Sequence, residues 1–321
     1  MKRWRRATAV AVAAGLGGVT MLAEETPKQS EDAPSADDVY EQAKSLFDQY
    51  APPELKEQFD FPTREQWDRF AAKLQQALEN DDLGALAAYL PQARAALLAL
   101  RAIPGYEDYA DWLEERLDYI EAAQQAGASP APPPPPKTSA PVAVRGAVVP
   151  YYDLWLKRVR ARPVPPVAPA LMPELRAAFA AEGVPAEIAW LAEVESTLNP
   201  KARSPAGAKG LFQLMPDTAK NLGLSTFLPD ERTNPEKSAR AAARYLRTLH
   251  GKFGTWPLAF AAYNAGEGRV ERLLKKRGAD TFAEIAPALP SETRMYVPKV
   301  CATIAVRAGV PPDRLPPPNG G

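Results

Sequence analysis

A proline-rich tract divides this chain and limits what can fold on either side of it. Residues 129–141 read SPAPPPPPKTSAP. Proline has no backbone N–H and a fixed φ angle, so this run cannot continue a helix or pair within a sheet, and it favours an extended spacer. We therefore predict a linker at 129–141 between two domains. A chain of 321 residues is long enough for two domains of ordinary size.

The two sides of the linker carry opposite charge, although the whole chain is formally neutral. Residues 24–141 hold 10 basic and 23 acidic side chains, a net charge of −13. Residues 142–321 hold 25 basic and 16 acidic side chains, a net charge of +9. A basic part of this kind suits an anionic polymer as a binding partner.

The first 23 residues have the pattern of an export signal. Four basic residues precede a weakly apolar run over residues 7–23; they are Lys2, Arg3, Arg5 and Arg6. This run is about 17 residues long, shorter than the roughly 20 that cross a bilayer comfortably. We therefore predict a signal peptide at 1–23 and a location in the periplasm or cell envelope. The alternative is an uncleaved N-terminal anchor, which would be the chain's only contact with a membrane.

The composition predicts an all-α protein and excludes several kinds of catalysis. Helix-favouring residues dominate, and apolar positions recur at helical spacing. Catalytic triads, Cys–His pairs and zinc sites need more histidine or cysteine than the single His250 and Cys301. We expect Cys301 to be buried and His250 to end a helix just before Gly251. The sequence requires no metal and no cofactor, and we expect no nucleic-acid partner.

The acidic segment at 24–128 is predicted to be a small helical domain without chemistry of its own. Three apolar stripes at helical spacing indicate its helices, at residues 39–50, 67–78 and 113–120. The last stripe consists of Leu113, Leu117 and Ile120. The role of this domain stays open. It could bind a protein partner, restrain the basic domain through charge, or act as a spacer.

In the basic part, one carboxylate occupies an unusual helix position. Pro185 is predicted to be the first residue of a helix. At about 100° per residue, Glu195 falls within the apolar stripe that includes Ile188 and Leu191. Its neighbour Glu193 falls on the opposite side, where we expect solvent. Apolar surroundings disfavour the charged form of a carboxyl group, so Glu195 is a candidate proton donor. On periodicity alone, the alternative is a helix-end carboxylate paired with an arginine.

Two further helices follow a compact turn at residues 204–210, where two glycines and a Ser-Pro pair let the backbone approach a ligand closely. Residues 234–236 predict the start of the first helix, whose inward residues are Ala239, Ala243, Leu246 and Leu249. Its outer face carries Arg240, Arg244 and Arg247, for which we favour solvation over binding of anionic groups. The second helix begins at Trp256-Pro257 and ends in AAYNAGEG.

Four blocks of this basic part resemble the soluble-type lytic transglycosylases (SLT domain, glycoside hydrolase family 23), which share the goose-type lysozyme fold. The blocks are AEVESTLNPKARSPAGAKGLFQLMP, DERTNPEKSARAAARYL, AFAAYNAGEGRV and ETRMYVPKV, in the family's order and within about residues 150–308. The resemblance implies an all-α, lysozyme-like catalytic domain at 142–310. We expect residues 311–321 to be a disordered proline- and glycine-rich tail.

The resemblance also implies which residues form the site. Glu195 matches the family's catalytic acid/base. Seven further residues match substrate-binding positions: Ser204, Gln213, Met215, Tyr263, Asn264, Glu292 and Tyr296. For Gln213, Met215 and Tyr263, packing alone is the alternative. Glu292 could instead cap a helix or hold Arg294.

The implied reaction is non-hydrolytic cleavage of the β-1,4 bond between N-acetylmuramic acid and N-acetylglucosamine in peptidoglycan strands. Glu195 would protonate the glycosidic oxygen while the sugar's own 2-acetamido group stabilises the cationic centre. Glu195 would then take the proton of the 6-hydroxyl, which closes a 1,6-anhydro ring. Two alternatives stay open. One is a hydrolytic muramidase on the same fold, and the other is a non-catalytic wall-binding or scaffold protein.

Overall fold

The computed structural model describes residues 107–127, 148–204 and 207–319, together with isolated positions between residues 44 and 101. The chain divides into two units, residues 1–120 and 121–321, and helix α6 (Glu107–Gly127) spans the division. Leu117 and Ile120 of the third stripe are buried in this helix, as predicted. The predicted signal segment, the linker at 129–141 and the apolar residues of the first two stripes lie outside the described residues.

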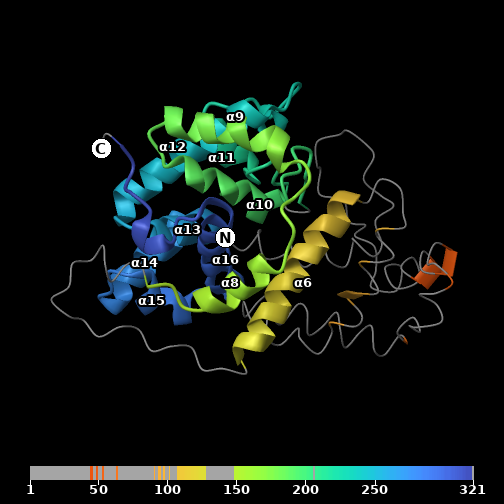
Figure 1. The fold of residues 1–321 in the computed structure, drawn as a ribbon, viewed down its shortest axis with the longest axis horizontal. Coiled ribbons are helices and arrows are strands. Elements are labelled where there is room, and N and C mark those ends of the chain that lie inside the picture. Colours follow the sequence, from red (N-terminus) through yellow and green to blue (C-terminus); the bar gives the residue numbers. More distant parts are fainter. Residues whose placement is uncertain are drawn as a thin grey trace, which may run out of the picture. The chain divides into compact units, whose positions relative to one another are not determined.

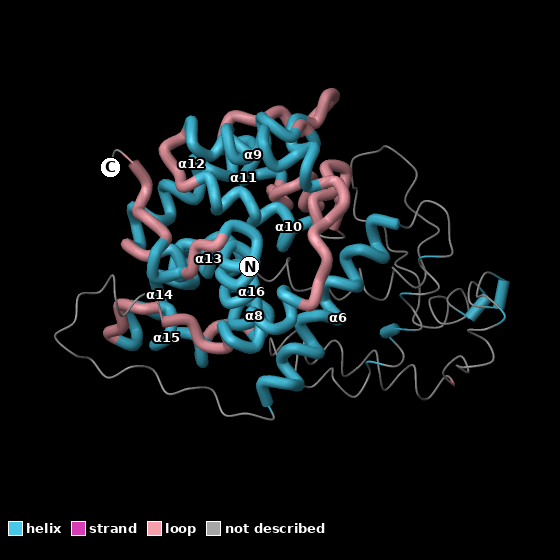
Figure 2. Tube along the Cα trace, viewed as in Figure 1, coloured by secondary structure: helices cyan, strands magenta, loops and turns pink. Residues whose placement is uncertain are grey.

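All regular elements in the described part of the chain are helical (Figures 1 and 2). After α6 they are α8 (Tyr152–Arg160), α9 (Ala168–Ala181), the 3₁₀ turn η2 (Ala186–Trp190), α10 (Leu191–Ser196), α11 (Pro216–Asn221), η3 (Glu231–Thr233), α12 (Pro235–Phe253), α13 (Trp256–Ala265), α14 (Glu267–Arg277), α15 (Phe282–Ile285), η4 (Ala286–Ala288), α16 (Ser291–Ala308) and η5 (Pro312–Arg314). This confirms the all-α class for the described residues. None of these helices is long and apolar enough to cross a membrane.

Helix α13 forms the centre of the second unit. Its sequence, WPLAFAAYNA, is apolar on every side, and the residues from Trp256 through Ala262 are all buried. A helix that is apolar all round is stable only inside a core. Helices α12, α14 and α16 accordingly pack around it (Figure 2). The polar end of α13, with Tyr263 and Asn264, is thereby held between α12 and α16.

Helix α12 begins as predicted and ends later than predicted. The Asn234 side chain accepts a hydrogen bond from the backbone N–H of Lys237 at 2.9 Å, and Pro235 follows as the first helical residue. The four expected inward residues are fully buried. Gly251 does not end the helix, because the left-handed conformation that a C-cap requires is adopted by Gly254, at φ 77°. His250 instead packs its ring on Trp256, with centroids 4.4 Å apart.

The outer arginines of α12 fasten it to the end of α9. Arg240 and Arg244 donate to the Glu182 carboxylate at 3.4 and 3.2 Å, and Arg247 donates to the Glu182 backbone carbonyl at 2.9 Å. These contacts lie on a face that is solvated, as predicted: the side chains of Arg240 and Arg244 are 39% and 38% exposed, and Arg247 is exposed. Cations at the C-terminal end of a helix also interact favourably with its dipole, so these contacts stabilise the crossing of the two helices.

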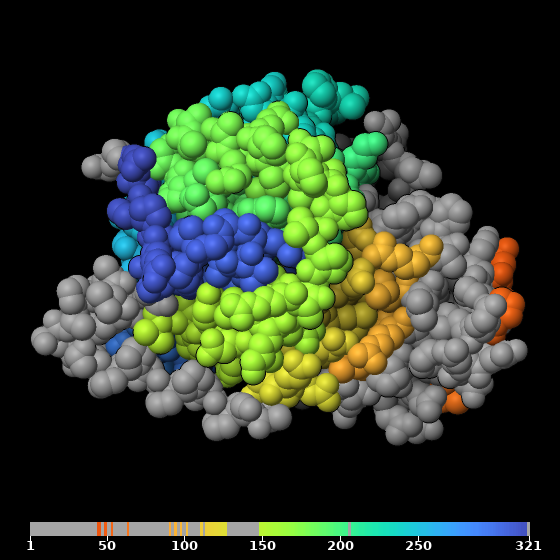
Figure 3. Space-filling model, viewed as in Figure 1, coloured from red at the N-terminus to blue at the C-terminus, as the bar shows by residue number. Residues whose placement is uncertain are grey.

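The C-terminal segment packs on the second unit, and the prediction of a disordered tail from residue 311 is wrong through Asn319. The Trp256 indole donates to the Pro316 carbonyl at 2.8 Å, and the Asn319 backbone N–H donates to the Gly183 carbonyl at 2.7 Å. Figure 3 shows this segment in dark blue against the green segments. Proline-rich composition removes backbone donors, but proline carbonyls still accept hydrogen bonds. Cys301 on α16 is buried, as predicted.

Candidate active site

The segment that carries Glu195 is a 3₁₀ turn followed by a short α-helix. Pro185 precedes η2 with an extended ψ of 126°, so the helical turn begins one residue later than predicted. Ile188 and Leu191 are completely buried, and Glu195 lies half-buried on the same apolar face. This confirms the position of Glu195 within the apolar stripe.

Glu193 is not solvated, contrary to the prediction. Its carboxylate accepts hydrogen bonds from Arg307 Nη2 at 2.7 Å and from Nε at 2.9 Å. Only 13% of the Glu193 side chain and 4% of the Arg307 side chain is exposed. The end of α16 covers this side of α10, and Arg307 also donates to the carbonyls of Arg162 and Pro163. The two carboxylates of α10 therefore have different partners: an arginine for Glu193 and a tyrosine for Glu195.

Tyr296 of α16 holds Glu195. Its hydroxyl donates to Glu195 Oε1, and only 2% of the Tyr296 residue is exposed. A buried phenol is positioned by the packing of its ring, so its hydroxyl offers a fixed donor to the carboxyl group. This contact joins residues 101 positions apart in the sequence. Glu195 and Tyr296, two of the predicted site residues, are therefore in direct contact.

Tyr263 lies close enough to Glu195 to interact with it electrostatically. Burial raises the pKa of Tyr263 well above its usual value, and the negative charge of Glu195 raises this pKa further. Tyr263 therefore keeps its proton, and its hydroxyl donates to the Phe212 carbonyl at 2.6 Å. This hydrogen bond ties α13 to the loop that follows Glu195.

The two predicted amide side chains are oriented by hydrogen bonds. Gln213 Nε2 donates to the Gly210 carbonyl at 2.9 Å and also to the Ala202 carbonyl at 3.4 Å, so its carbonyl oxygen is the atom left to accept. Asn264 Oδ1 accepts from the Thr293 hydroxyl at 2.7 Å, so its amide nitrogen is the atom left to donate. One amide thus offers an acceptor and the other offers a donor.

The other three predicted residues are placed by local structure. The Ser204 hydroxyl accepts from the Ala208 N–H at 3.0 Å and closes the turn. Met215 is the residue before α11, and Glu292 lies in the first turn of α16. All three are half-buried. Tyr296 and Tyr263 interact with Glu195, whereas Ser204, Met215 and Glu292 stay predicted site residues.

The chain reverses sharply after Glu195 through two strained residues. Thr197 and Leu198 adopt positive φ angles of 51° and 63°, which non-glycine residues rarely do. The Ser196 hydroxyl donates to the carbonyls of Ala192 and Leu211, both at 3.0 Å, and so fixes the end of α10 to the following loop. Such strain persists only where surrounding contacts hold it, and it concentrates at functional sites.

Arg232 clamps the loop that carries Gln213, and sequence reasoning missed it. Its guanidinium is 4% exposed and donates to the carbonyls of Gly207 and Leu214 at 2.9 and 3.1 Å. Hydrogen bonds from Arg232 hold the pKa of the Asp230 carboxyl far below its usual range. Asp230 in turn accepts from Lys209 in the same loop at 2.9 Å. Asp230 and Arg232, two residues apart in the motif DERTNP, were the sequence signal for this clamp. We used the motif only to predict the start of a helix.

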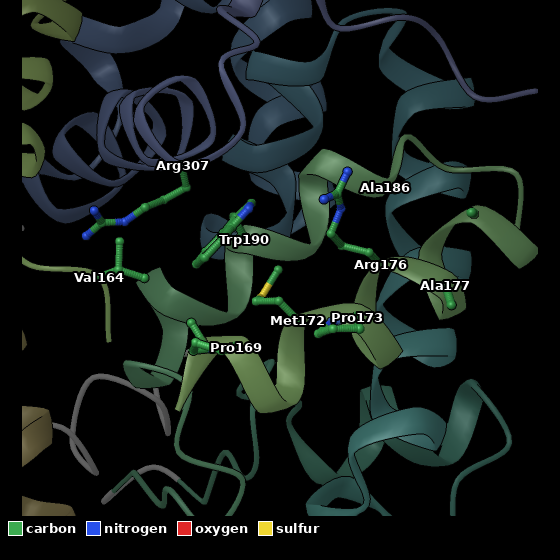
Figure 4. A pocket seen from close by; sticks show the side chains of 11 residues that line it. Val164, Pro169, Met172, Pro173, Arg176, Ala177, Ala186, Trp190 and Arg307 are labelled. Carbon is green, nitrogen blue, oxygen red and sulfur yellow. The ribbon is translucent and has the colours of Figure 1, made fainter. Parts of the chain in front are cut away.

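An apolar cavity of about 680 Å³ lies elsewhere in the second unit (Figure 4). The residues that line it include Met172, Pro173 and Trp190, together with Arg176 and Arg307. It contains none of the predicted site residues. In the described part of the chain, no three acidic, histidine or cysteine side chains cluster as they would around a metal ion.

A half-buried carboxyl group that accepts a hydrogen bond from a tyrosine can donate and accept a proton. Residues 174–286 match the family model described as "Transglycosylase SLT domain". The matched residues include Glu195, Gln213 and Tyr263, and end before Glu292 and Tyr296.

Two curated relatives are similar to a little over a third of this chain. "Membrane-bound lytic murein transglycosylase D" of Escherichia coli K12 is 42% identical over 124 residues, which is 37% of this chain and 27% of the relative. "Soluble lytic murein transglycosylase" of Salmonella typhimurium LT2 is 40% identical over 122 residues, 35% of this chain and 19% of the relative. The chain thus matches about a quarter or less of the length of these relatives.

A solved structure of an inactive mutant of lytic transglycosylase Slt from Pseudomonas aeruginosa is also similar. It is 20% identical, with a TM-score of 0.40, covering 97% of this chain and 69% of that one.

Proposed function

We propose that this chain is a peptidoglycan lytic transglycosylase with Glu195 as its single catalytic acid and base. One observation carries the proposal: within the residues that match the SLT family model, Glu195 lies on an apolar helix face and is held by the Tyr296 hydroxyl. Glu195 donates a proton to the glycosidic oxygen between N-acetylmuramic acid and N-acetylglucosamine. It then accepts the proton of the 6-hydroxyl, which attacks the anomeric carbon and closes a 1,6-anhydro ring.

Two of the predicted site residues, Gln213 and Asn264, suit an N-acetylated sugar. An acetamido group carries one N–H donor and one carbonyl acceptor. The acceptor of Gln213 and the donor of Asn264 complement these two atoms. In the proposed site, Ser204, Met215, Tyr263, Glu292 and Tyr296 complete the surface that binds the glycan strand.

The remaining features extend the proposal to the whole chain. Residues 1–23 export the protein to the periplasm or cell envelope, residues 129–141 form the linker, and residues 142–310 form the catalytic domain. The acidic segment at 24–128 is proposed to recruit a protein partner. It holds 9 basic and 23 acidic side chains, and this net charge of −14 favours a basic partner.

Product analysis tests the proposed reaction. We expect the purified chain to release fragments from peptidoglycan sacculi that end in 1,6-anhydro-muramic acid, because the 6-hydroxyl takes the place of water. Mass spectrometry distinguishes these ends from reducing ends by the mass of one water molecule. Fragments with reducing ends would identify a hydrolytic muramidase. Binding to sacculi without any release would identify a non-catalytic wall-binding protein.

Thr293 is expected to act on the substrate through Asn264. Thr293→Val keeps the shape of the side chain but removes the hydroxyl that fixes Asn264 Oδ1, so the amide is free to rotate. A hydrogen bond of this kind contributes about 1 kcal/mol, so we expect KM for glycan strands to rise roughly fivefold. Steady-state kinetics measure this change. Thr248→Val, on the exposed side of α12, is the matched control, and an equal KM for Thr293→Val and the wild type would reject this role.

A further inference from the structure

Tyr245 of α12 packs directly on Tyr263. The two ring centroids are 5.5 Å apart and the rings are tilted by 44°. Tyr263 in turn interacts electrostatically with Glu195, and its hydroxyl donates a hydrogen bond to the Phe212 carbonyl. Tyr245 is therefore one ring away from the proposed catalytic carboxyl group, on the side of the site formed by α12.

The Tyr245 hydroxyl is available to a ligand. Among the described residues this hydroxyl has no hydrogen-bond partner. Its oxygen is also not fully buried, so solvent can reach it. Most tyrosine hydroxyls in half-buried positions find a partner. The Tyr263 hydroxyl already donates to the Phe212 carbonyl. Of this tyrosine pair, Tyr245 therefore has the hydroxyl that can still donate to a ligand.

Tyr245 also extends from the interior of the site toward the surface. Its hydroxyl interacts electrostatically with Glu267, at the start of α14, and with Lys252, near the end of α12. Both of these side chains are exposed and lie 3.6 Å apart as an ion pair. Tyr245 thus contacts the half-buried Tyr263 and also interacts with the exposed Glu267–Lys252 pair. Burial raises the pKa of Tyr245, so its hydroxyl keeps a proton to donate.

We propose that Tyr245 is a further substrate-binding residue, whose hydroxyl hydrogen-bonds a hydroxyl or acetamido group of a sugar next to the cleaved bond. The inference rests on the proposed function, because it places a glycan strand over Glu195. It assigns Tyr245 a role in binding and leaves proton transfer to Glu195.

Tyr245→Phe tests this role, since it removes the hydroxyl and keeps the ring that packs on Tyr263. We expect KM for glycan strands to rise about three- to tenfold with kcat unchanged, the effect of one lost hydrogen bond. Tyr152→Phe is the matched control. Tyr152 is also half-buried without a hydroxyl partner among the described residues, but it lies beside Cys301 and Asp313.

A binding measurement separates this inference from the proposed function. Calorimetry on full-length Glu195→Gln protein, titrated with a peptide-free tetrasaccharide of alternating N-acetylglucosamine and N-acetylmuramic acid, gives the reference Kd. Adding Tyr245→Phe to this variant is expected to raise the Kd about three- to tenfold. An unchanged Kd, alongside an active wild type, would overturn the role of Tyr245 alone. An inactive wild type and no binding by the Glu195→Gln protein would refute the proposed function, and this inference with it.

Discussion

Glu195→Gln is expected to lower the rate of product release from sacculi by about 10³-fold or more, because the same carboxyl group donates and later accepts the proton. Glutamine has the same shape and can still accept the hydrogen bond from Tyr296, so the fold should be retained. The measurement is the rate of release of anhydro-ended fragments, with the melting temperature recorded on the same samples.

Glu187→Gln provides the matched control for this loss. Glu187 lies in η2, just before α10, and pairs with the half-exposed Arg176 at 3.6 Å. Ion pairs near the surface contribute about 1 kcal/mol or less, so this variant should keep the activity and stability of the wild type. A Glu195→Gln rate within tenfold of wild type would mean that another group supplies the proton.

Gly210→Ala is expected to be the most destabilising small substitution in the loop that carries Gln213. Gly210 has a φ of 79°, and a Cβ there would lie 1.9 Å from the backbone carbonyl oxygen of Arg232. Arg232 cannot easily retreat, because its side chain is bonded to two carbonyls of the same loop. We expect a loss of about 3 kcal/mol or more in the free energy of unfolding, which lowers the melting temperature by roughly 10 °C.

Gly223→Ala separates the clash from the backbone strain. Gly223 has a similar φ of 82°, but a Cβ there meets nothing within 4 Å. This control should lose only about 1 kcal/mol, the cost of placing alanine in the left-handed region. Thermal unfolding of both variants measures the difference. Equal losses would show that the loop moves away from Arg232 at little cost.

Local sequence signals predicted the helices that surround the site. Asn234-Pro235 marked the start of α12, and the spacing of its alanines and leucines identified the buried face. The run from Trp256 predicted α13. These signals succeeded because capping and helical periodicity depend on residues within a few positions of one another. The end of α12 was missed because Gly251 and Gly254 both fit a C-cap, and only the backbone conformation distinguishes them.

Contacts between distant parts of the chain could not be predicted in the same way. Helical periodicity placed Glu193 opposite the apolar stripe, but it could not show that Arg307 would cover it. The same holds for the tail, whose composition suggested disorder although Trp256 and Gly183 bind its backbone. In both cases the partner lies on another element, more than 50 positions away.

The sequence by itself determined that this part of the chain is helical, that Glu195 lies on an apolar face, and which motif residues accompany it. The tertiary structure decided which of these side chains touch: Tyr296 on Glu195, Tyr263 on Phe212, and Thr293 on Asn264. The physical reason is the distance along the chain over which each interaction acts. Periodicity and caps act within one or two helical turns, whereas the partner of a functional side chain is chosen by how helices pack across the core.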